Sequence, residues 1–426
     1  MQSSVEEKID KLFQTGFFHI FGSSVVNKIM NFLSSVILVR LVSKSEYGVY
    51  SYALNIYSLL LIFSGLGIEP AVMQAGCENR YNDETREDIY AFGIKYGTKV
   101  NCMLAIIFIF ISLVIPLPIT GAGNILVMLS FLPVLSFWYG MQMVYLRINI
   151  KNRHYSIMTT INTALVTMGT ITGALSGGIN GVVVSRYLAM GASILVSYVL
   201  YHVPLFIKCN SLNKGEKSDL LGIATISLVN NGLSQILFLL DVFVIGLVMM
   251  DENAVAIYKT ATQIPNALTF IPSCIVVYIY PFFASHNKEP IWCLKRYRQL
   301  LGVMSVTNAF ISVALVLFAP IIITLIFGRQ YIDAVSVFRI LSVSYFFSGT
   351  FRIIAGNLLV TQRKLKYNMF VAVLSGLVNI IADFCFIHFW GGVGAALATF
   401  LVVFITSTMT VCYYVYTLKK NIRISV

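Results

Sequence analysis

Apolar runs long enough to cross a bilayer recur from one end of the chain to the other. Windows of about 20 mainly apolar residues, which span a hydrocarbon core as an α-helix, alternate with short polar connections. The first six predicted spans cover residues 18–41, 48–69, 97–117, 124–146, 156–175 and 179–203. The other six cover residues 222–249, 254–283, 302–327, 334–359, 367–389 and 392–416. The pattern predicts an all-α integral membrane protein with twelve transmembrane helices.

The composition agrees with this class. The chain has 426 residues, of which 58% are hydrophobic and 11% charged. A soluble domain carries about 25% charged residues. The low charge of this chain over its whole length therefore excludes an ordinary soluble fold.

The basic residues predict the orientation. Most of the Lys and Arg residues fall on one set of alternate connections, whereas the opposite set holds Arg40, Lys44 and Arg329. Because cytoplasmic loops carry the excess of basic residues, we expect both termini in the cytoplasm. The net charge of +12 is thus spread over cytoplasmic connections and forms no nucleic-acid surface.

The cysteines and the amino-terminal residues add two smaller expectations. The seven cysteines show no paired spacing that could hold zinc, so we expect neither a disulfide nor a metal site. No cleavable signal peptide is visible in residues 1–16. Apolar residues there recur at helical spacing, which fits either an interfacial helix or an extension of the first span.

The two halves of the chain repeat one another. Residues 47–53 resemble residues 255–261, and the glycine-rich turn at residues 177–181 resembles the one at residues 391–394. Six spans per half return the chain to the cytoplasm, so the halves share one orientation. We therefore expect a six-helix lobe at residues 1–203, a cytoplasmic linker at 204–221 and a second lobe at 222–426.

Two stretches near the amino terminus carry a family resemblance. Residues 40–50, RLVSKSEYGVY, and 65–71, GLGIEPA, resemble the signature of polysaccharide exporters in the multidrug/oligosaccharidyl-lipid/polysaccharide (MOP) superfamily. Further support for this resemblance comes from Asp241, from the Tyr258 region and from residues 327–331. Within that superfamily the chain looks most like O-antigen repeat-unit flippases of the Wzx type.

The resemblance implies a MATE-like fold in the bacterial cytoplasmic (inner) membrane. It implies translocation of an undecaprenyl-pyrophosphate-type lipid-linked oligosaccharide between the leaflets for polysaccharide or lipopolysaccharide synthesis. Membrane lipids, a polysaccharide polymerase and chain-length proteins are the partners that such a role implies.

Three cations inside the predicted spans are the candidate substrate-binding residues: Lys28, Arg186 and Arg352. A charge at the bilayer centre costs about 3 kcal/mol, so it persists mainly in a wet cavity or a pair. Arg holds phosphate oxygens in a forked geometry and Lys supplies a point charge, which suits a pyrophosphate. A structural ion pair for Arg186 and snorkelling for Arg352 stay open as alternatives.

Asp241 and Asp383 are the buried acids. A carboxylate in a low-dielectric interior can take up a proton or coordinate sodium as the lobes rock, which makes this pair candidates for H⁺ or Na⁺ coupling. Alternatively, they are counter-ions for the buried cations. No other cofactor is expected.

Four prolines, at positions 133, 265, 272 and 320, interrupt predicted spans. They either provide the kinks of an alternating-access cycle or are merely tolerated by packing.

Three alternative functions remain. A drug or metabolite antiporter on the same fold would favour an acidic cavity, whereas the central charged residues here are three bases and two acids. A membrane glycan polymerase or glycosyltransferase would need acidic catalytic residues, but Glu46, Asp251, Glu252 and Asp333 on the outer side show no paired spacing. We therefore expect no enzymatic activity. A flippase for the peptidoglycan precursor differs only in cargo and commonly has two more spans.

Overall fold

The computed structural model of the protein describes residues 17–78, 82–205 and 212–425, and these residues form helices and connections without a strand. By packing, the chain divides into two compact units, Met1–Ile236 and Leu237–Val426. The division falls inside helix α9 (Lys214–Met249), whereas the sequence predicts a linker at 204–221. The predicted lobe boundaries and the interfacial helix, which lies outside the described residues, stay predictions.

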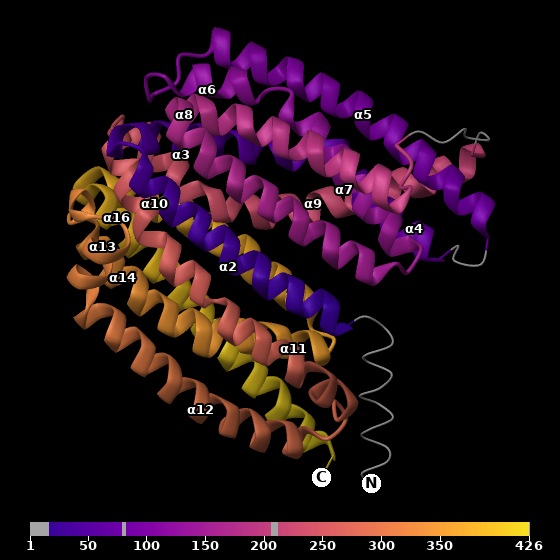
Figure 1. Cartoon of the computed structure of the whole chain (residues 1–426). Helices are drawn as coiled ribbons and strands as arrows, with labels where there is room; N and C mark the ends of the chain where they lie inside the picture. The colour runs from indigo at the N-terminus through magenta and orange to yellow at the C-terminus, as the bar shows by residue number, and fades with distance from the viewer. Residues whose placement is uncertain (1–16, 79–81, 206–211, 426) are drawn as a thin grey trace. The chain divides into compact units, whose positions relative to one another are not determined.

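The first unit is built from helices α2 to α8 and the first part of α9 (Figure 1). These are α2 (Phe17–Leu41), α3 (Lys44–Leu60), the 3₁₀ segment η1 (Leu61–Gly67), α4 (Ile68–Glu78), α5 (Asp83–Val114), α6 (Ala122–Leu129), α7 (Leu132–Ile148) and α8 (Asn152–Tyr201). Helix α7 packs against α4, α5 and α8, and α2 packs along α8.

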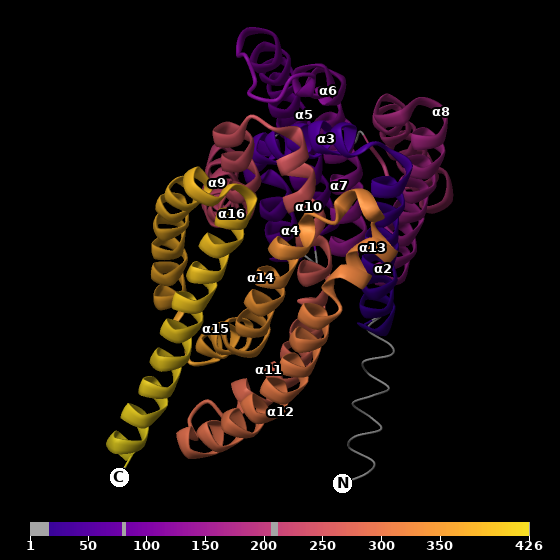
Figure 2. The ribbon, with the colours of Figure 1, turned by 90° about the vertical axis from the view of Figure 1, so that its left-hand side faces the viewer.

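The second unit holds the rest of α9 and all later helices. These are α10 (Glu252–Leu268), α11 (Phe270–Ser285), α12 (Pro290–Leu317), α13 (Ala319–Ile326), the 3₁₀ turn η2 (Arg329–Tyr331), α14 (Ala334–Phe347), the π-helical segment η3 (Ser348–Arg352), α15 (Ile353–Thr361) and α16 (Leu365–Ser425). Helix α14 packs against α10, α12 and α16, and α15 lies beside α16, which runs to the C-terminus (Figure 2).

Among the described residues, eight helices are long and apolar enough to cross a membrane, or up to nine if α6 and α7 form one span bent by 44°. This confirms a multi-pass helical protein. The twelve-span count and the cytoplasmic placement of both termini stay predictions.

Two of these helices are too long for one span. Helix α8 has 50 residues and α16 has 61, lengths of about 75 and 90 Å against a hydrocarbon core of about 30 Å. Both break at the predicted glycine turns, at Gly178 (φ 55°, ψ −139°) and Gly391 (φ 55°, ψ −134°). Only glycine adopts this backbone conformation readily, which explains why the repeat retains it in both halves.

The chain reverses direction at the first break. A Cβ atom on Gly173 would lie 2.4 Å from the carbonyl oxygen of Gly181. In a continuous helix residues eight apart are about 12 Å apart, so the two parts of α8 pack against each other as a hairpin. These glycines let the two parts of α8 approach closely.

Three of the four prolines lie at the start of a helix, and the fourth lies inside one. Pro133, Pro272 and Pro320 lie in the first turns of α7, α11 and α13, and Pro265 lies near the end of α10. The first turn of a helix does not use the N–H group that proline lacks, so Pro133, Pro272 and Pro320 cost no hydrogen bond, whereas Pro265 removes one inside α10.

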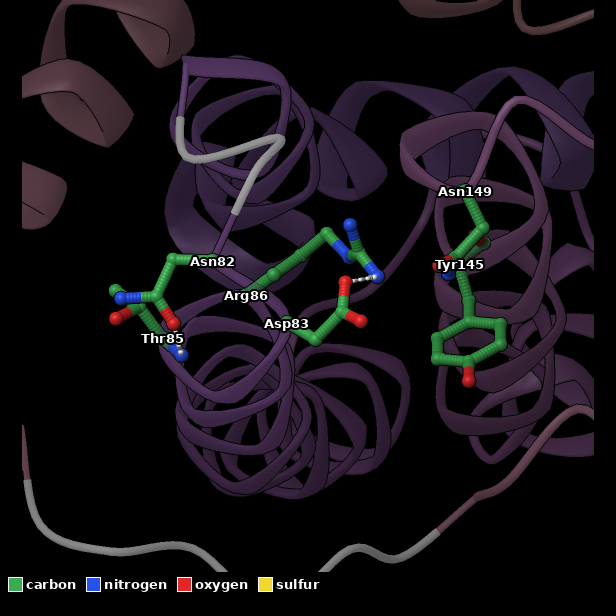
Figure 3. A network of polar contacts seen from close by, with 6 residues as sticks. All are labelled: Asn82, Asp83, Thr85, Arg86, Tyr145 and Asn149. Atoms are coloured by element: carbon green, nitrogen blue, oxygen red, sulfur yellow. Dashed lines mark hydrogen bonds and ion pairs between the residues drawn. The ribbon is translucent and has the colours of Figure 1, made fainter.

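A polar network caps the start of α5 (Figure 3). The Thr85 amide donates to Asn82 Oδ1 at 3.1 Å, and Arg86 donates to Asp83 Oδ1 at 2.6 Å. In α7, Asn149 Nδ2 donates to the Tyr145 carbonyl at 2.8 Å. These groups belong to connections that the sequence places on the cytoplasmic side.

The hairpin of α8 gives a matched test. We expect Gly173→Ala to lower the melting temperature in detergent, because the new methyl group meets backbone and overpacking costs about 1–3 kcal/mol. Gly191→Ala, in the same helix with nothing within 4 Å of the added Cβ, should leave the melting temperature unchanged or raise it. Equal melting temperatures for the two variants would contradict the hairpin contact.

Candidate functional site

The second unit contains a buried network of acidic and hydroxyl groups around Asp241 and Asp383. Asp241 Oδ2 accepts hydrogen bonds from Tyr258 and, at 2.7 Å, from Thr399 Oγ1. Asn379 Nδ2 lies 3.3 Å from Asp241 Oδ1 and 3.1 Å from Asp383 Oδ2, so this amide bridges the two carboxylates. The structure thus brings the two predicted acids together.

Three helices build this network, and the break at Gly391 makes it possible. Asp241 lies on α9 and Tyr258 on α10, while Asn379 and Asp383 lie one turn apart before the break in α16. Because α16 reverses direction at Gly391, Thr399 in its second part lies within hydrogen-bond distance of Asp241. A Cβ on Gly394 would lie 2.0 Å from the Phe386 carbonyl oxygen, so glycine is required for the two parts to approach.

The network has oxygen acceptor capacity that the protein does not fill. Asp383 is fully buried, and its Oδ1 atom has no hydrogen-bond partner among the described residues. Two adjacent carboxylates also repel each other when both are ionised. Such a cluster of carboxylate and hydroxyl oxygens suits a hard cation, or a proton shared between the acids.

Arg352 lies in the same unit, at the end of the π-helical segment in the predicted tenth span. Its Nη2 atom donates to Ser348 Oγ at 3.1 Å, and the side chain is half-buried. Asn308 on α12 supports the segment, since its Nδ2 atom donates to Thr350 Oγ1 at 3.1 Å and its Oδ1 atom accepts from Tyr345 at 3.0 Å. Single π turns inside α-helices occur frequently at functional sites.

The other two predicted cations lie in the first unit. Arg186, in α8, is half-buried with its guanidinium 5.7 Å from the centroid of the Tyr50 ring. Its Nε atom has no hydrogen-bond partner among the described residues. Lys28, in α2, is exposed. Arg352 belongs to the other unit, and the substrate-binding role of the three cations stays a prediction.

Sequence reasoning missed three residues of potential importance. Asn379 lies four positions before Asp383 in an apolar run, and this one-turn spacing was the available signal. Thr399 carries no signal, because threonine is common in membrane helices. Glu69 stands inside the resemblance motif but was assigned no role.

The described residues define a class: a multi-pass helical protein whose fold resembles solved structures of the MOP superfamily. An inward-facing multidrug resistance MATE transporter superposes with a TM-score of 0.75 at 13% identity, covering 94% of this chain and 96% of that one. The lipid II flippase MurJ, in an inward closed conformation, gives a TM-score of 0.71 at 17% identity, covering 94% and 87%. A MOP transporter from Pyrococcus furiosus gives 0.57 at 12% identity, covering 96% of each chain.

Residues 37–336 match the model of the family described as polysaccharide biosynthesis protein. The match covers more than half of the chain, so the chain belongs to this family. The resemblance inferred from the sequence is therefore confirmed. No curated protein matches the chain in sequence.

The amide bridge gives a testable consequence for stability. We expect Asn379→Ala to destabilise the protein by about 1–3 kcal/mol, because buried carboxylate oxygens lose their donor. Thermal unfolding in detergent measures this effect. The control is Asn357→Ala, which removes an exposed amide bonded only to its own helix at the Ile353 carbonyl. If both variants unfold like the wild type, the network does not support the fold.

Proposed function

We propose that the protein is a flippase for a lipid-linked oligosaccharide in the bacterial cytoplasmic membrane. The cargo is a polyprenyl-pyrophosphate-linked repeat unit of the O-antigen type, and the product feeds polysaccharide or lipopolysaccharide synthesis. One observation carries the proposal: a polysaccharide biosynthesis family match extends over residues 37–336 of a chain whose fold the lipid II flippase shares.

The physical task explains the need for buried cations. A pyrophosphate and a hydrophilic glycan must cross a hydrocarbon core while the lipid tail stays in the membrane. Arg and Lys side chains within the spans replace the water around the phosphate oxygens, and Arg does so with two parallel hydrogen bonds. Lys28, Arg186 and Arg352 are the proposed headgroup contacts, reached alternately from the two sides as the lobes rock.

Movement of the cargo requires a bias between inward and outward states. We propose that H⁺ or Na⁺ binding at Asp241 and Asp383 supplies it. The unfilled acceptor atom of Asp383 and the bridging Asn379 support a cation at this position. A cation that binds one state better than the other shifts the equilibrium by its differential affinity. No catalytic step is required, and a polysaccharide polymerase and chain-length proteins would act on the delivered unit.

A drug antiporter is the second candidate, favoured by the two buried acids and by the fold similarity to a multidrug transporter. An organic cation would pair with the carboxylates and would not need the three bases. Loss of resistance to cationic drugs on deletion, with normal surface polysaccharide, would select this candidate.

The headgroup contacts are tested by single alanine substitutions of Lys28, Arg186 and Arg352. Each removes charge-assisted hydrogen bonds, so we expect surface polysaccharide to fall about tenfold or more at unchanged membrane level. The control is Arg339→Ala, because Arg339 is exposed and its Nε atom donates to the Val316 carbonyl. Wild-type polysaccharide in all three variants would contradict the assignment.

The coupling site is tested by Asp241→Asn and Asp383→Asn in purified protein. We expect the wild type to show a sodium- or proton-dependent rise in melting temperature, because a cation that binds the folded state stabilises it. Both substitutions should abolish that rise, since each removes a ligand charge. The exposed Asp219→Asn variant is the control. A cation response that persists in both site variants would place the coupling ion elsewhere.

A further inference from the structure

The apolar segment Lys44–Glu78, which contains the predicted second span, is broken near its middle. Helix α3 ends at Leu60 and α4 begins at Ile68, and between them Ser64 is extended while Gly65 (φ 56°) and Leu66 (φ 48°) are left-handed. Leu66 holds this conformation although it is not glycine, which costs energy and is typical of functional sites. The break is anchored, because Ser64 Oγ donates to Asn101 Oδ1 at 2.9 Å.

The first part of α9 packs directly on this break, within the same unit. A Cβ on Gly67 would lie 2.2 Å from the Ala224 carbonyl oxygen, and a Cβ on Gly232 would lie 2.8 Å from Ile62. Glycine at both positions lets the two backbones approach. The break therefore packs directly against α9.

A cavity of about 440 Å³ lies beside the break, between η1, α4 and α9. Its polar lining consists of Ser58, Ser64, Glu69, Ser227 and Gln235. This volume falls within the range of small-molecule sites, about 300–1,000 Å³. It far exceeds the space that a bare monovalent cation fills.

Glu69 provides the charge of the cavity. Its carboxylate lies over Gly140 of α7, where a Cβ would come 2.8 Å from both Oε atoms. Among the described residues it has no ion pair and no hydrogen-bond donor. Its position in the first turn of α4 gives favourable helix-dipole contact, but both oxygens keep their acceptor capacity.

We propose that this cavity binds one sugar ring of the transported oligosaccharide. A carboxylate accepts two hydroxyl groups of a sugar. Ser58 and Ser64 already donate within the protein, so their oxygens accept, while Ser227 and the Gln235 carboxamide both donate and accept. The cavity is large enough for one hexose ring. The ring's identity as part of the cargo rests on the proposed function, whereas the sugar site itself is a property of the first unit.

Binding of free monosaccharides to the purified full-length protein tests the site. The probes are methyl α-glucoside and N-acetylglucosamine, followed by saturation-transfer NMR of the sugar ring protons. We expect saturable binding to the wild type. Glu69→Gln should weaken it about tenfold, because a charged acceptor becomes a neutral one. Gln235→Ala, at an exposed position, should weaken it as well.

The matched control is Glu78→Gln in the same helix, because Glu78 is exposed and bonded to Gln74 at 3.0 Å outside the cavity. It should bind sugar like the wild type. Absence of sugar binding to the wild type, or unchanged binding in Glu69→Gln, overturns the site. A Glu69-dependent stabilisation by sodium or by protons that neither sugar produces would assign the cavity to a cation and also overturn it.

These outcomes are separable from failure of the proposed function. If the alanine variants of Lys28, Arg186 and Arg352 lose surface polysaccharide but no sugar binds, the sugar site alone is wrong. If sugar binds through Glu69 but those variants keep their polysaccharide, the sugar site stands and the headgroup assignment fails.

Discussion

Hydrocarbon offers no partner to a polar group, and this constraint organises the structure. Backbone groups are satisfied within helices, and several hydroxyl groups in the helices bond to carbonyls one turn earlier, as Thr406 and Thr410 do in α16. Where the helix is irregular, side chains take over. Asn308 supports the π-helical segment, and Asn101 anchors the break of the second span. At these two places the protein itself satisfies the irregular segment.

The same constraint makes the incompletely satisfied groups informative. Asp383 has one buried oxygen without a donor, Arg186 has a buried Nε without an acceptor, and Glu69 has no partner among the described residues. Each costs free energy in the resting protein unless something else binds it. In the proposed flippase such occupants would bind in turn: a coupling cation at the acids, a diphosphate at the cations and a sugar at Glu69.

The fold was largely predictable from hydropathy, because spans of about 20 apolar residues leave a strong signal. The glycine turns of α8 and α16 were visible as a repeat and were confirmed. The pairing of Asp241 with Asn379, 138 residues away, could not be read from local pattern, although both acids could be singled out as buried charges. The break at residues 64–66 also escaped prediction, because Leu66 gives no hint of a left-handed conformation.

The central claim is that a cation gradient drives a lipid-linked oligosaccharide across the membrane through this protein. The most direct test is reconstitution of the purified wild type into vesicles with a polyprenyl-diphosphate-linked oligosaccharide in one leaflet, under an imposed sodium or proton gradient. The account predicts that the glycan becomes accessible to a membrane-impermeant lectin on the other side, faster with the gradient than without it. Glycan that stays in its original leaflet, in vesicles that transport a cationic drug, would contradict the account.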